Sequence, residues 1–299
     1  MNDRPAGGRC WIDKDSGVAM NTEFNISCEG WQDPDEPLSY TFGLNSETEK
    51  PPTILHDSES PFLLKPILVE QGLAANNYTK TFYAKITDKY GAFTKVDDIK
   101  VTVLPRPKRN TDEPVSISQE LGGLVNNIED LAGEGDAGAM ASLCASLAGE
   151  LNLEATGDTE STTTTPVSTT AAVYTTEEEA SYVFQYSYVP TTEVPKTKKE
   201  IAEQQRKDRT KMRENMSKQV VKGASSAADI GDAQQILSAC VKLTQEPTEM
   251  STKTSGSVMT TLNSLLVLRQ MFRIAHRLKI LRTRLNWSLN LLEIASMLT

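Results

Sequence analysis

The sequence predicts an α+β protein in separate domains: an N-terminal antiparallel β-sandwich of the fibronectin type III or immunoglobulin-like type, then an α-helical region interrupted by a disordered Thr-rich linker. Apolar residues alternate with polar ones in roughly the first hundred residues, then recur every three or four residues, and a Thr-rich tract with little to bury divides the later part. The predicted boundaries are 1–106 for the sandwich, 107–154 for a first helical segment, 155–195 for the linker and 196–299 for a second helical segment.

Several short strands are predicted in the sandwich, because the side chains of a half-buried strand point alternately to the core and to solvent. The first two strands have their apolar positions at Phe24, Ile26 and Cys28, and at Leu38, Tyr40 and Phe42. Two later stretches, 78–88 and 98–105, repeat the alternation, and the sequence Asp-Lys-Tyr-Gly at 88–91 is typical of a turn between them. Strands of this length and spacing are typical of a sandwich.

An acidic cluster of Asp33, Asp35 and Glu36 lies between the first two strands and raises the question of a metal site. Calcium needs about six to eight oxygen ligands from converging segments, and the glycine of an EF-hand loop is missing here. Asp and Pro are favoured in turns, and Pro34 and Pro37 stiffen this one. We interpret the cluster as a solvated turn and predict no metal ligands; a metal site is the alternative.

Helices are predicted where apolar positions recur every three or four residues. One such stripe consists of Leu121, Leu124, Val125, Ile128 and Leu131. A second helix is expected at 137–151, and a third, highly charged helix at 196–222, where Glu203 and Lys207 have the i,i+4 spacing of an ion pair. The narrow apolar stripe of the third helix consists of Ile201, Met212, Met216 and Val220.

Two segments repeat one another without gaps: residues 135–147, GDAGAMASLCASL, and residues 231–243, GDAQQILSACVKL. Asp, Ser, Cys and Leu occupy equivalent positions in both. Asp136 and Asp232 are predicted to be N-caps, and Gln235 lies where the partner in a capping box would be. The repeat therefore predicts two similar helices.

The four cysteines form no Cys-x-x-Cys pair, so the sequence gives no support to a zinc ribbon or a thioredoxin-like centre. For Cys10 and Cys28 we favour a disulfide over two unpaired thiols, because the glycosylation motifs described next indicate an oxidising compartment. Cys144 and Cys240 lie on the repeated helices. They could be bridged if those helices pack side by side with the Cα atoms within about 7 Å, or they are two small buried residues, and neither alternative is preferred.

Four asparagines lie in N-glycosylation motifs: Asn25, Asn77, Asn215 and Asn286. Asn25 and Asn77 fall near predicted strand edges and favour a secreted context, so they are the preferred sites. The N-terminus lacks the apolar stretch of a signal peptide, and no run of about 18 apolar residues could span a membrane. The chain is therefore expected to be a piece of a larger protein or an incomplete gene model.

Neither catalysis nor nucleic-acid binding is predicted. The net charge of −9 argues against general nucleic-acid affinity. The two histidines, His56 in a Pro-rich loop and His276 in a basic helix, offer little for a catalytic triad, and no hydrolase, zinc-peptidase, dinucleotide or P-loop motif occurs. We expect no enzyme activity and no cofactor.

The C-terminal stretch 265–285 is basic and amphipathic. Its cationic face consists of Arg269, Arg273, His276, Arg277 and Arg284, and its apolar face of Leu268, Met271, Ala275, Leu278 and Leu281. We favour the solvated face of a helix packed in a bundle over a helix lying on a membrane surface.

The order of several residues resembles the last sandwich of the receptor-for-egg-jelly (REJ) region in polycystin-type proteins. The residues that carry the resemblance are Cys10, Gly17, Ala19, Thr22, Phe24, Cys28, Pro37, Leu38, Tyr40 and Phe42. The stretch 88–105 resembles the closing strands of the same module. In that family a Gly-Asp-initiated helix, and later a segment such as LTQEPTEMS at 243–251, lead towards the helical part of an autoproteolysis-inducing (GAIN) domain.

The resemblance implies a non-enzymatic ectodomain segment at the extracellular face of the plasma membrane, and it carries over the Cys10–Cys28 bridge residue by residue. It implies adhesion, ligand sensing or regulation of a cation channel located outside these residues, with protein or glycan ligands at the cell surface. The family's Cys-rich cleavage motif, lipid-binding domain and membrane spans do not occur here, so membrane attachment is expected through regions outside the chain. The alternative is a membrane-peripheral or intracellular scaffold that uses the basic C-terminal helix.

Overall fold

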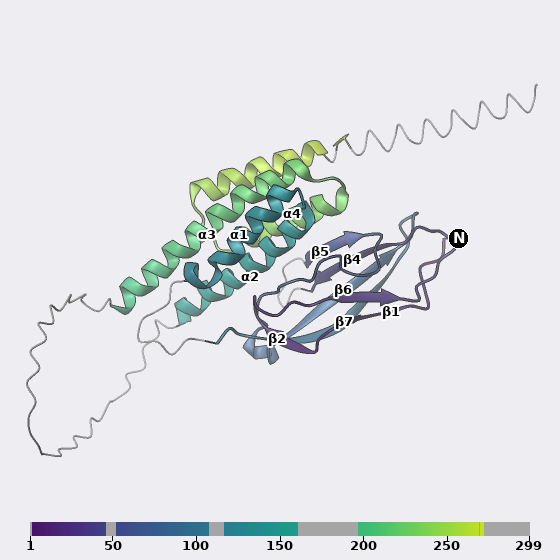
Figure 1. Cartoon of the computed structure of the whole chain (residues 1–299), viewed down its shortest axis with the longest axis horizontal. Helices are drawn as coiled ribbons and strands as arrows, with labels where there is room; N and C mark the ends of the chain where they lie inside the picture. The colour runs from purple at the N-terminus through teal and green to yellow at the C-terminus, as the bar shows by residue number, and fades with distance from the viewer. Residues whose placement is uncertain (1, 46–51, 108–116, 161–196, 269, 272–299) are drawn as a thin grey trace, which may run out of the picture.

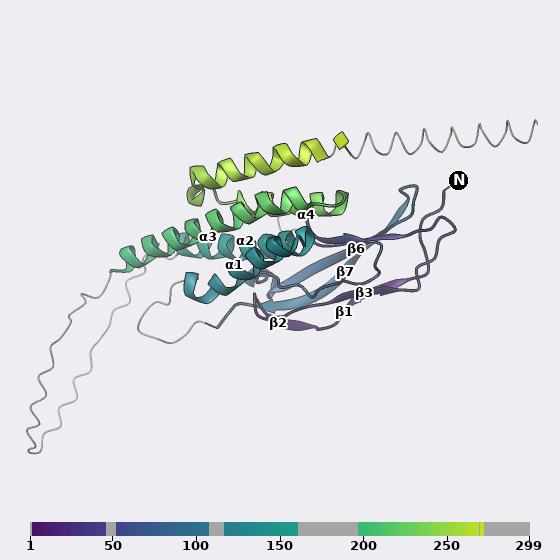
Figure 2. The same cartoon turned by 45° about the horizontal axis from the view of Figure 1, so that its top comes forward.

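A computed structural model describes residues 2–45, 52–107, 117–160, 197–268 and 270–271. Within these residues every strand precedes the first α-helix, as the sequence predicts. Figures 1 and 2 show the helices as a layer against one side of the strand-built part.

The N-terminal part consists of two sheets. Its strands are β1 (Arg9–Ile12), β2 (Ser16–Val18), β3 (Ile26–Glu29), β4 (Ser39–Leu44), β5 (Thr53–Ser58), β6 (Thr79–Thr87) and β7 (Phe93–Leu104). Strands β1 and β3 pair in a small antiparallel sheet, and the order β2-β7-β6-β4-β5 forms the larger one. The predicted sandwich is present, with one departure: β2 pairs in parallel with β7, so the larger sheet is mixed. This pairing covers the outer edge of β7, whose backbone groups would otherwise lack partners.

The core of the sandwich lies where the alternating pattern predicts it. Phe24 and Ile26 from the β3 side, and Phe42 and Phe82 from the larger sheet, have no exposed surface. Of the positions that predicted the first two strands, only Leu38 is half-buried rather than buried. A side-chain period of two therefore fixed the inward faces of both strands.

The turn between β6 and β7 is the predicted Asp-Lys-Tyr-Gly sequence. The Asp88 carboxylate accepts hydrogen bonds from the backbone N–H groups of Tyr90 and Ala92, at 2.8 and 2.9 Å. Gly91 has φ +94°, a conformation that side-chain-bearing residues rarely adopt.

The helical part begins with α1 (Ile117–Glu134) and α2 (Ala137–Glu160), and continues with α3 (Lys198–Ser226) and α4 (Ile230–Leu243). Two short 3-10 helices, Ala74–Asn76 and Pro247–Glu249, and a helix at 252–268 complete the described elements. Helix α2 runs beyond the predicted end of its segment at residue 154. The Thr-rich tract at 161–196 lies outside the described residues.

Helix α2 is the centre of the helical part and contacts α1, α3, α4 and β5. Its middle, from Met140 to Leu151, is buried on nearly every side, which small residues such as Ala141, Ala145 and Ala148 permit. The periodic apolar residues predicted on α1, and Met212, Met216 and Val220 of those predicted on α3, belong to the helical core, whereas Ile201 lies outside it. The predicted Glu203–Lys207 pair is present at 3.6 Å.

The sandwich and the helices are joined by more than the connecting chain. Helices α2 and α4 pack on β5 (Figure 1), and Met20 of the sandwich lies in the helical core. The backbone N–H of Ile54 in β5 donates to the hydroxyl of Ser238 in α4 at 3.2 Å. The sandwich and the helical part are thus distinct, as predicted, and the structure adds that they share an interface.

Candidate functional site

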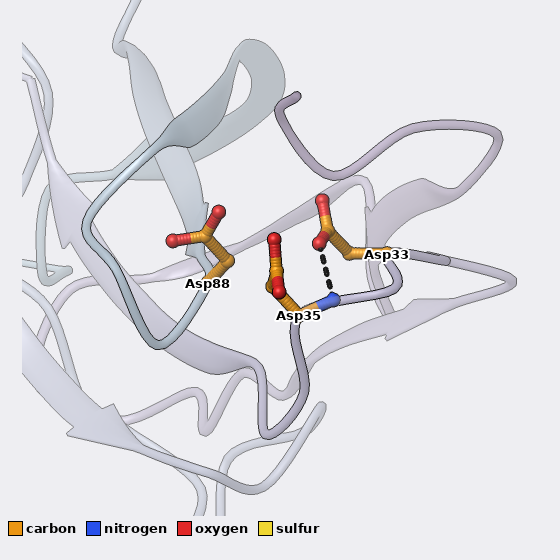
Figure 3. A group of neighbouring side chains, drawn as sticks. All are labelled: Asp33, Asp35 and Asp88. Carbon is orange, nitrogen blue, oxygen red and sulfur yellow. Dashed lines mark hydrogen bonds between the residues drawn. The ribbon is translucent and has the colours of Figure 1, made fainter. Parts of the chain in front are cut away.

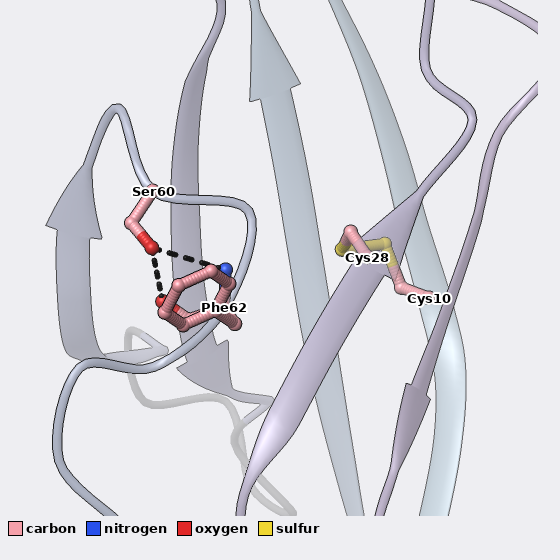
Figure 4. The surroundings of a disulfide bond; sticks show 4 residues. All are labelled: Cys10, Cys28, Ser60 and Phe62. Carbon is pink, nitrogen blue, oxygen red and sulfur yellow. Dashed lines mark hydrogen bonds between the residues drawn. A yellow bond between two sulfur atoms is a disulfide. The ribbon is translucent and has the colours of Figure 1, made fainter.

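The predicted disulfide between Cys10 and Cys28 is present. The two residues lie directly opposite one another in the β1–β3 ladder, with Cα atoms 4.1 Å apart. Figure 4 shows the bridge beside the 60–62 loop, which pairs with the other edge of β3 through Phe62 and Ser27. The bridge therefore fixes the N-terminal strand to the small sheet.

Several residues behind the REJ resemblance have a packing role that the structure explains. A Cβ added to Gly17 would lie 2.6 Å from Thr22 and 2.7 Å from the ring of Phe24. The Thr22 hydroxyl accepts the backbone N–H of Val18 at 2.9 Å, and Ala19 is fully buried. This cluster closes the short loop after β2 over the core.

The repeated helices start differently. Asp136 caps α2 as predicted, because its carboxylate accepts the backbone N–H of Ala139 at 3.0 Å. The prediction for Asp232 is wrong: Asp229 is the N-cap of α4 and accepts the N–H of Asp232, so α4 begins earlier than the repeat suggests. The sequence Ala-Asp-Ile at 228–230 supplies this earlier cap.

Gln235 has no capping role either. It is buried, and in the amide orientation that satisfies its neighbours it donates to the carbonyls of Gly138 and Leu55 and accepts from the N–H of Asp57. One side chain thus joins α4 to α2 and to β5 at the interface between helices and sandwich.

Cys144 and Cys240 are free and buried, which decides between the two predicted alternatives. Their helices do pack side by side, as a bridge requires. Burial, with a smaller contribution from the neighbouring thiol, raises the pKa of Cys144, and burial raises the pKa of Cys240 to about 12. Both are therefore neutral thiols in the helical core.

A buried ion cluster crosses the interface. The Glu70 carboxylate lies 3.2 Å from the ammonium group of Lys80 in β6 and 3.0 Å from that of Lys242 in α4. Burial alone would raise the pKa of Glu70, but the two ammonium groups outweigh it and lower the pKa to about 2. Glu70 is therefore ionised throughout the neutral range.

A second charged cluster surrounds Arg106, just after β7. Its guanidinium contacts the carboxylates of Glu120 in α1 and of Glu150 and Glu154 in α2. Burial and the adjacent carboxylates outweigh Arg106 and raise the pKa of Glu154 to about 7. Glu154 is therefore the acid of this cluster that takes up a proton near neutral pH.

The segment 243–251, quoted for its resemblance to the family, contains a third buried ionic group. Glu249 is 2 % exposed and accepts from Arg209 at 2.6 Å and from two guanidinium nitrogens of Arg213 at 3.2 Å. Both arginines belong to α3. These ion pairs hold the segment on α3, because a buried ion pair is stable only when its charged groups keep good hydrogen-bond geometry.

An acidic cleft of about 620 Å³ opens where β5 and the 63–68 loop meet α1, α2 and α4. Its acidic lining residues are Glu23, Asp57, Asp130, Glu134, Asp136, Asp229 and Asp232. Lys65 is the cation among the lining residues and pairs with Asp136 at 2.6 Å. Burial lowers the pKa of His56, also in the lining, although Asp136 and Asp229 oppose this effect.

The glycosylation motifs lie in different settings. Asn77 is exposed at the end of a short 3-10 helix, whereas Asn25 is half-buried and its side-chain oxygen is covered. Asn215 lies within α3 beside buried Met216 and Ser217, a setting that leaves little access for a modifying enzyme in the folded chain. Asn286 lies outside the described residues.

Asp33 and Asp35 lie in the β3–β4 connection, as predicted for a turn, and Glu36 is exposed there. The structure adds Asp88 from the β6–β7 turn (Figure 3). One carboxylate oxygen of each of the three aspartates lies within 4.8 Å of the others. No sequence signal links Asp88 to the other two, because the contact depends on where two separate loops meet.

The basic C-terminal helix can be followed only at its start. Leu268 is half-buried and Met271 is 60 % exposed, while the arginines that define its cationic face lie outside the described residues. Among the residues that the structure describes, no helix combines the length and apolar character of a membrane span.

Sequence reasoning missed the charged residues that form ion pairs in the folded chain, Glu70, Lys242, Arg106 and Glu249. Isolated charges between apolar positions have no local pattern that distinguishes a buried pair from a solvated one. The acidic cleft was missed for the same reason, although the Asp-rich starts of α2 and α4 contribute to it.

Comparisons with known proteins agree with the resemblance. The REJ domain family model matches residues 1–144, which include the sandwich, α1 and the first part of α2. The mouse (Mus musculus) polycystin family receptor for egg jelly is 24% identical over 125 residues, which cover 38% of this chain and 6% of that protein. No solved structure matches the chain. The matched residues are those of the disulfide-bonded sandwich and its first helices, and the two matches together support a fragment of the REJ/polycystin family.

Proposed function

We propose that the chain is a non-enzymatic extracellular module of a polycystin-type membrane glycoprotein. In this proposal it binds protein or glycan ligands and passes contact or force towards a membrane portion that regulates a cation channel. The family match, the Cys10–Cys28 disulfide and the exposed Asn77 motif support an extracellular location.

The observation on which this proposal rests is the interface between the sandwich and the helices. Glu70 pairs with Lys80 inside the sandwich and with Lys242 on α4, and Glu70 is only 4 % exposed. A buried charge is costly unless its partners keep their geometry, so a change in the position of α4 costs energy. We therefore expect a force on the sandwich to be transmitted to the helices and not to be lost in movement of the two parts relative to one another.

The acidic cleft is the binding surface that this arrangement favours. Its carboxylates come from both parts of the molecule, from Asp57 in β5 and from Asp136 at the N-cap of α2 and Asp232 in α4. A basic segment of a protein ligand complements this charge and contacts both parts at once. Ligand binding and the sandwich–helix interface are thereby coupled.

The location is tested on the chain secreted from mammalian cells behind an added signal peptide. Non-reducing mass spectrometry is expected to find a Cys10–Cys28 peptide and glycans on Asn77 and Asn25. Free thiols at both cysteines together with bare asparagines would contradict the extracellular location.

The coupling is tested by following the two parts separately during urea unfolding. In a Trp287→Phe background, fluorescence reports Trp11 and Trp31 of the sandwich, and circular dichroism at 222 nm reports the helices. The two transitions are expected to coincide in the parent and to separate in Lys242→Met, which removes the cross-interface ion pair. Lys253→Met, at an exposed ion pair with Glu214, is the matched control. Separate transitions in the parent would contradict mechanical coupling.

A further inference from the structure

The three aspartates in Figure 3 come from two loops at the same end of the sandwich. Asp33 and Asp35 follow β3, and Asp88 starts the β6–β7 turn. With one oxygen of each within 4.8 Å of the others, three carboxylates converge on a space the size of one ion. Like charges at this separation repel one another unless a cation lies between them.

An exposed lysine contacts one edge of the group. The ammonium group of Lys89 lies 3.5 Å from an Asp35 oxygen, with 38% of its side chain exposed, and it also lies over the ring of Tyr90. One ammonium group does not balance three carboxylates. The side chain of Asn2 is close to Asp88 and, with the turn N–H groups, lowers the pKa of Asp88 against the opposing effect of burial.

A second observation concerns the oxygens that are left without partners. Asp88 is 4 % exposed, and its Oδ1 atom accepts the N–H groups of Tyr90 and Ala92. Asp33 uses its Oδ1 atom in the same way, accepting the N–H of Asp35 at 2.8 Å. The Oδ2 atoms of both residues are buried and have no hydrogen-bond partner in the described part of the chain. Buried oxygens without partners are rare in native proteins and require an explanation.

We propose that Asp33, Asp35 and Asp88 bind a calcium ion. The donors are carboxylate oxygens, with no histidine or thiolate among them, which favours a hard cation over zinc. Calcium accepts irregular geometry and completes its shell with water and neutral oxygens such as the Asn2 amide, whereas magnesium demands a near-ideal octahedron. Each Oδ1 atom keeps its turn hydrogen bond, and the unpartnered Oδ2 atoms turn to the ion.

The ion would link two loops that lie far apart in sequence. It would hold the β3–β4 connection to the β6–β7 turn, close to Asn2 at the start of the chain. A site with three carboxylates and several waters belongs to the weak class with Kd of about 0.1–1 mM, a range that extracellular calcium fills. Binding itself is independent of the proposed function, but occupancy in the organism rests on the extracellular location.

The test uses calorimetric titration and thermal melts of the full chain with CaCl2. We expect one site with Kd of about 0.1–1 mM and a rise in Tm of about 3–6 °C at 10 mM CaCl2. MgCl2 at the same concentration is expected to bind at least about tenfold more weakly.

The variants Asp88→Asn and Asp33→Asn remove charge while an amide oxygen still accepts the turn N–H groups, so both are expected to fold. Each is expected to weaken calcium binding at least about tenfold. Asp98→Asn, at an exposed position on β7, is the matched control and should bind as the parent does.

No heat of binding with CaCl2, an equal response to MgCl2, or unchanged affinity in Asp88→Asn would each overturn the site. These outcomes leave the disulfide and glycan measurements untouched, so failure of the calcium site is distinguishable from failure of the proposed function.

Discussion

Replacing Glu70 with Gln should destabilise the protein by about 3 kcal/mol at pH 7. Two ammonium groups lower the pKa of Glu70 to about 2, from an ordinary value of 4.5. Each pKa unit corresponds to about 1.4 kcal/mol of preference for the ionised form in the folded state. Gln has the shape of Glu but is neutral, so it forfeits this preference and leaves Lys80 and Lys242 without their shared carboxylate.

The lowered pKa of Glu70 also makes the stability of the protein depend on pH. A carboxyl group whose folded pKa lies below its unfolded pKa stabilises the fold above the unfolded value. That stabilisation is lost as the pH falls from about 4.5 towards about 2. The difference between parent and Glu70→Gln should therefore stay near 3 kcal/mol down to about pH 5 and shrink to about 1 kcal/mol at pH 3.

The assay is urea unfolding of parent and Glu70→Gln at pH 7, 5, 4 and 3, followed by circular dichroism. Glu59→Gln, at an exposed position after β5, is the control and should change stability by less than about 0.5 kcal/mol. A difference below about 0.5 kcal/mol at pH 7, or one that does not shrink in acid, would refute the ion-cluster reasoning.

Three further changes test other parts of the structure by the same unfolding measurements. Glu249→Gln removes the negative charge that the buried guanidinium groups of Arg209 and Arg213 both contact and should cost about 3–5 kcal/mol; a cost below about 1 kcal/mol would show that the group is solvated. Gly17→Ala forces a methyl group against Thr22 and Phe24 and should cost about 1–3 kcal/mol, and a neutral result would mean that this loop yields easily. The pKa of Glu154 is raised to about 7, so ionising this carboxyl destabilises the fold as the pH rises from about 4.5 to 7. Glu154→Gln should therefore be more stable than the parent by about 1 kcal/mol at pH 8 and show no gain at pH 4. Lower stability of the variant at pH 8 would mean that the pairing of Glu154 with Arg106 dominates.

The strands could be predicted because their signals are local or follow a fixed period, whereas the disulfide was predicted from the glycosylation motifs and the family resemblance. Alternation placed Phe24, Ile26 and Phe42 in the core, and the turn sequence at 88–91 placed the β6–β7 hairpin. The stripe on α1 and the Glu203–Lys207 pair follow in the same way from the helical repeat. Such patterns depend on backbone geometry that every strand or helix shares.

The repeat shows where local reasoning stops. Its two copies share Asp, Ser, Cys and Leu, yet only Asp136 is an N-cap, and Gln235 bonds to β5 and α2 instead of its own helix. Asp229, which lies outside the repeated segment, is the N-cap of α4 and accepts the N–H of Asp232. Sequence similarity predicted two similar helices but not which polar group satisfies each helix end.

By itself, the sequence determined the class of the strand and helix segments that the structure describes, the burial pattern of the strands and the family resemblance, because periodicity, turn chemistry and residue order are properties of the chain. Only the tertiary structure decided that Cys144 and Cys240 stay unbridged, that Glu70 pairs with Lys242, and that Asp88 meets Asp33 and Asp35. These contacts depend on which distant segments converge, and the free energy of a charge is set by the groups and the solvent around it after folding rather than by its neighbours in sequence.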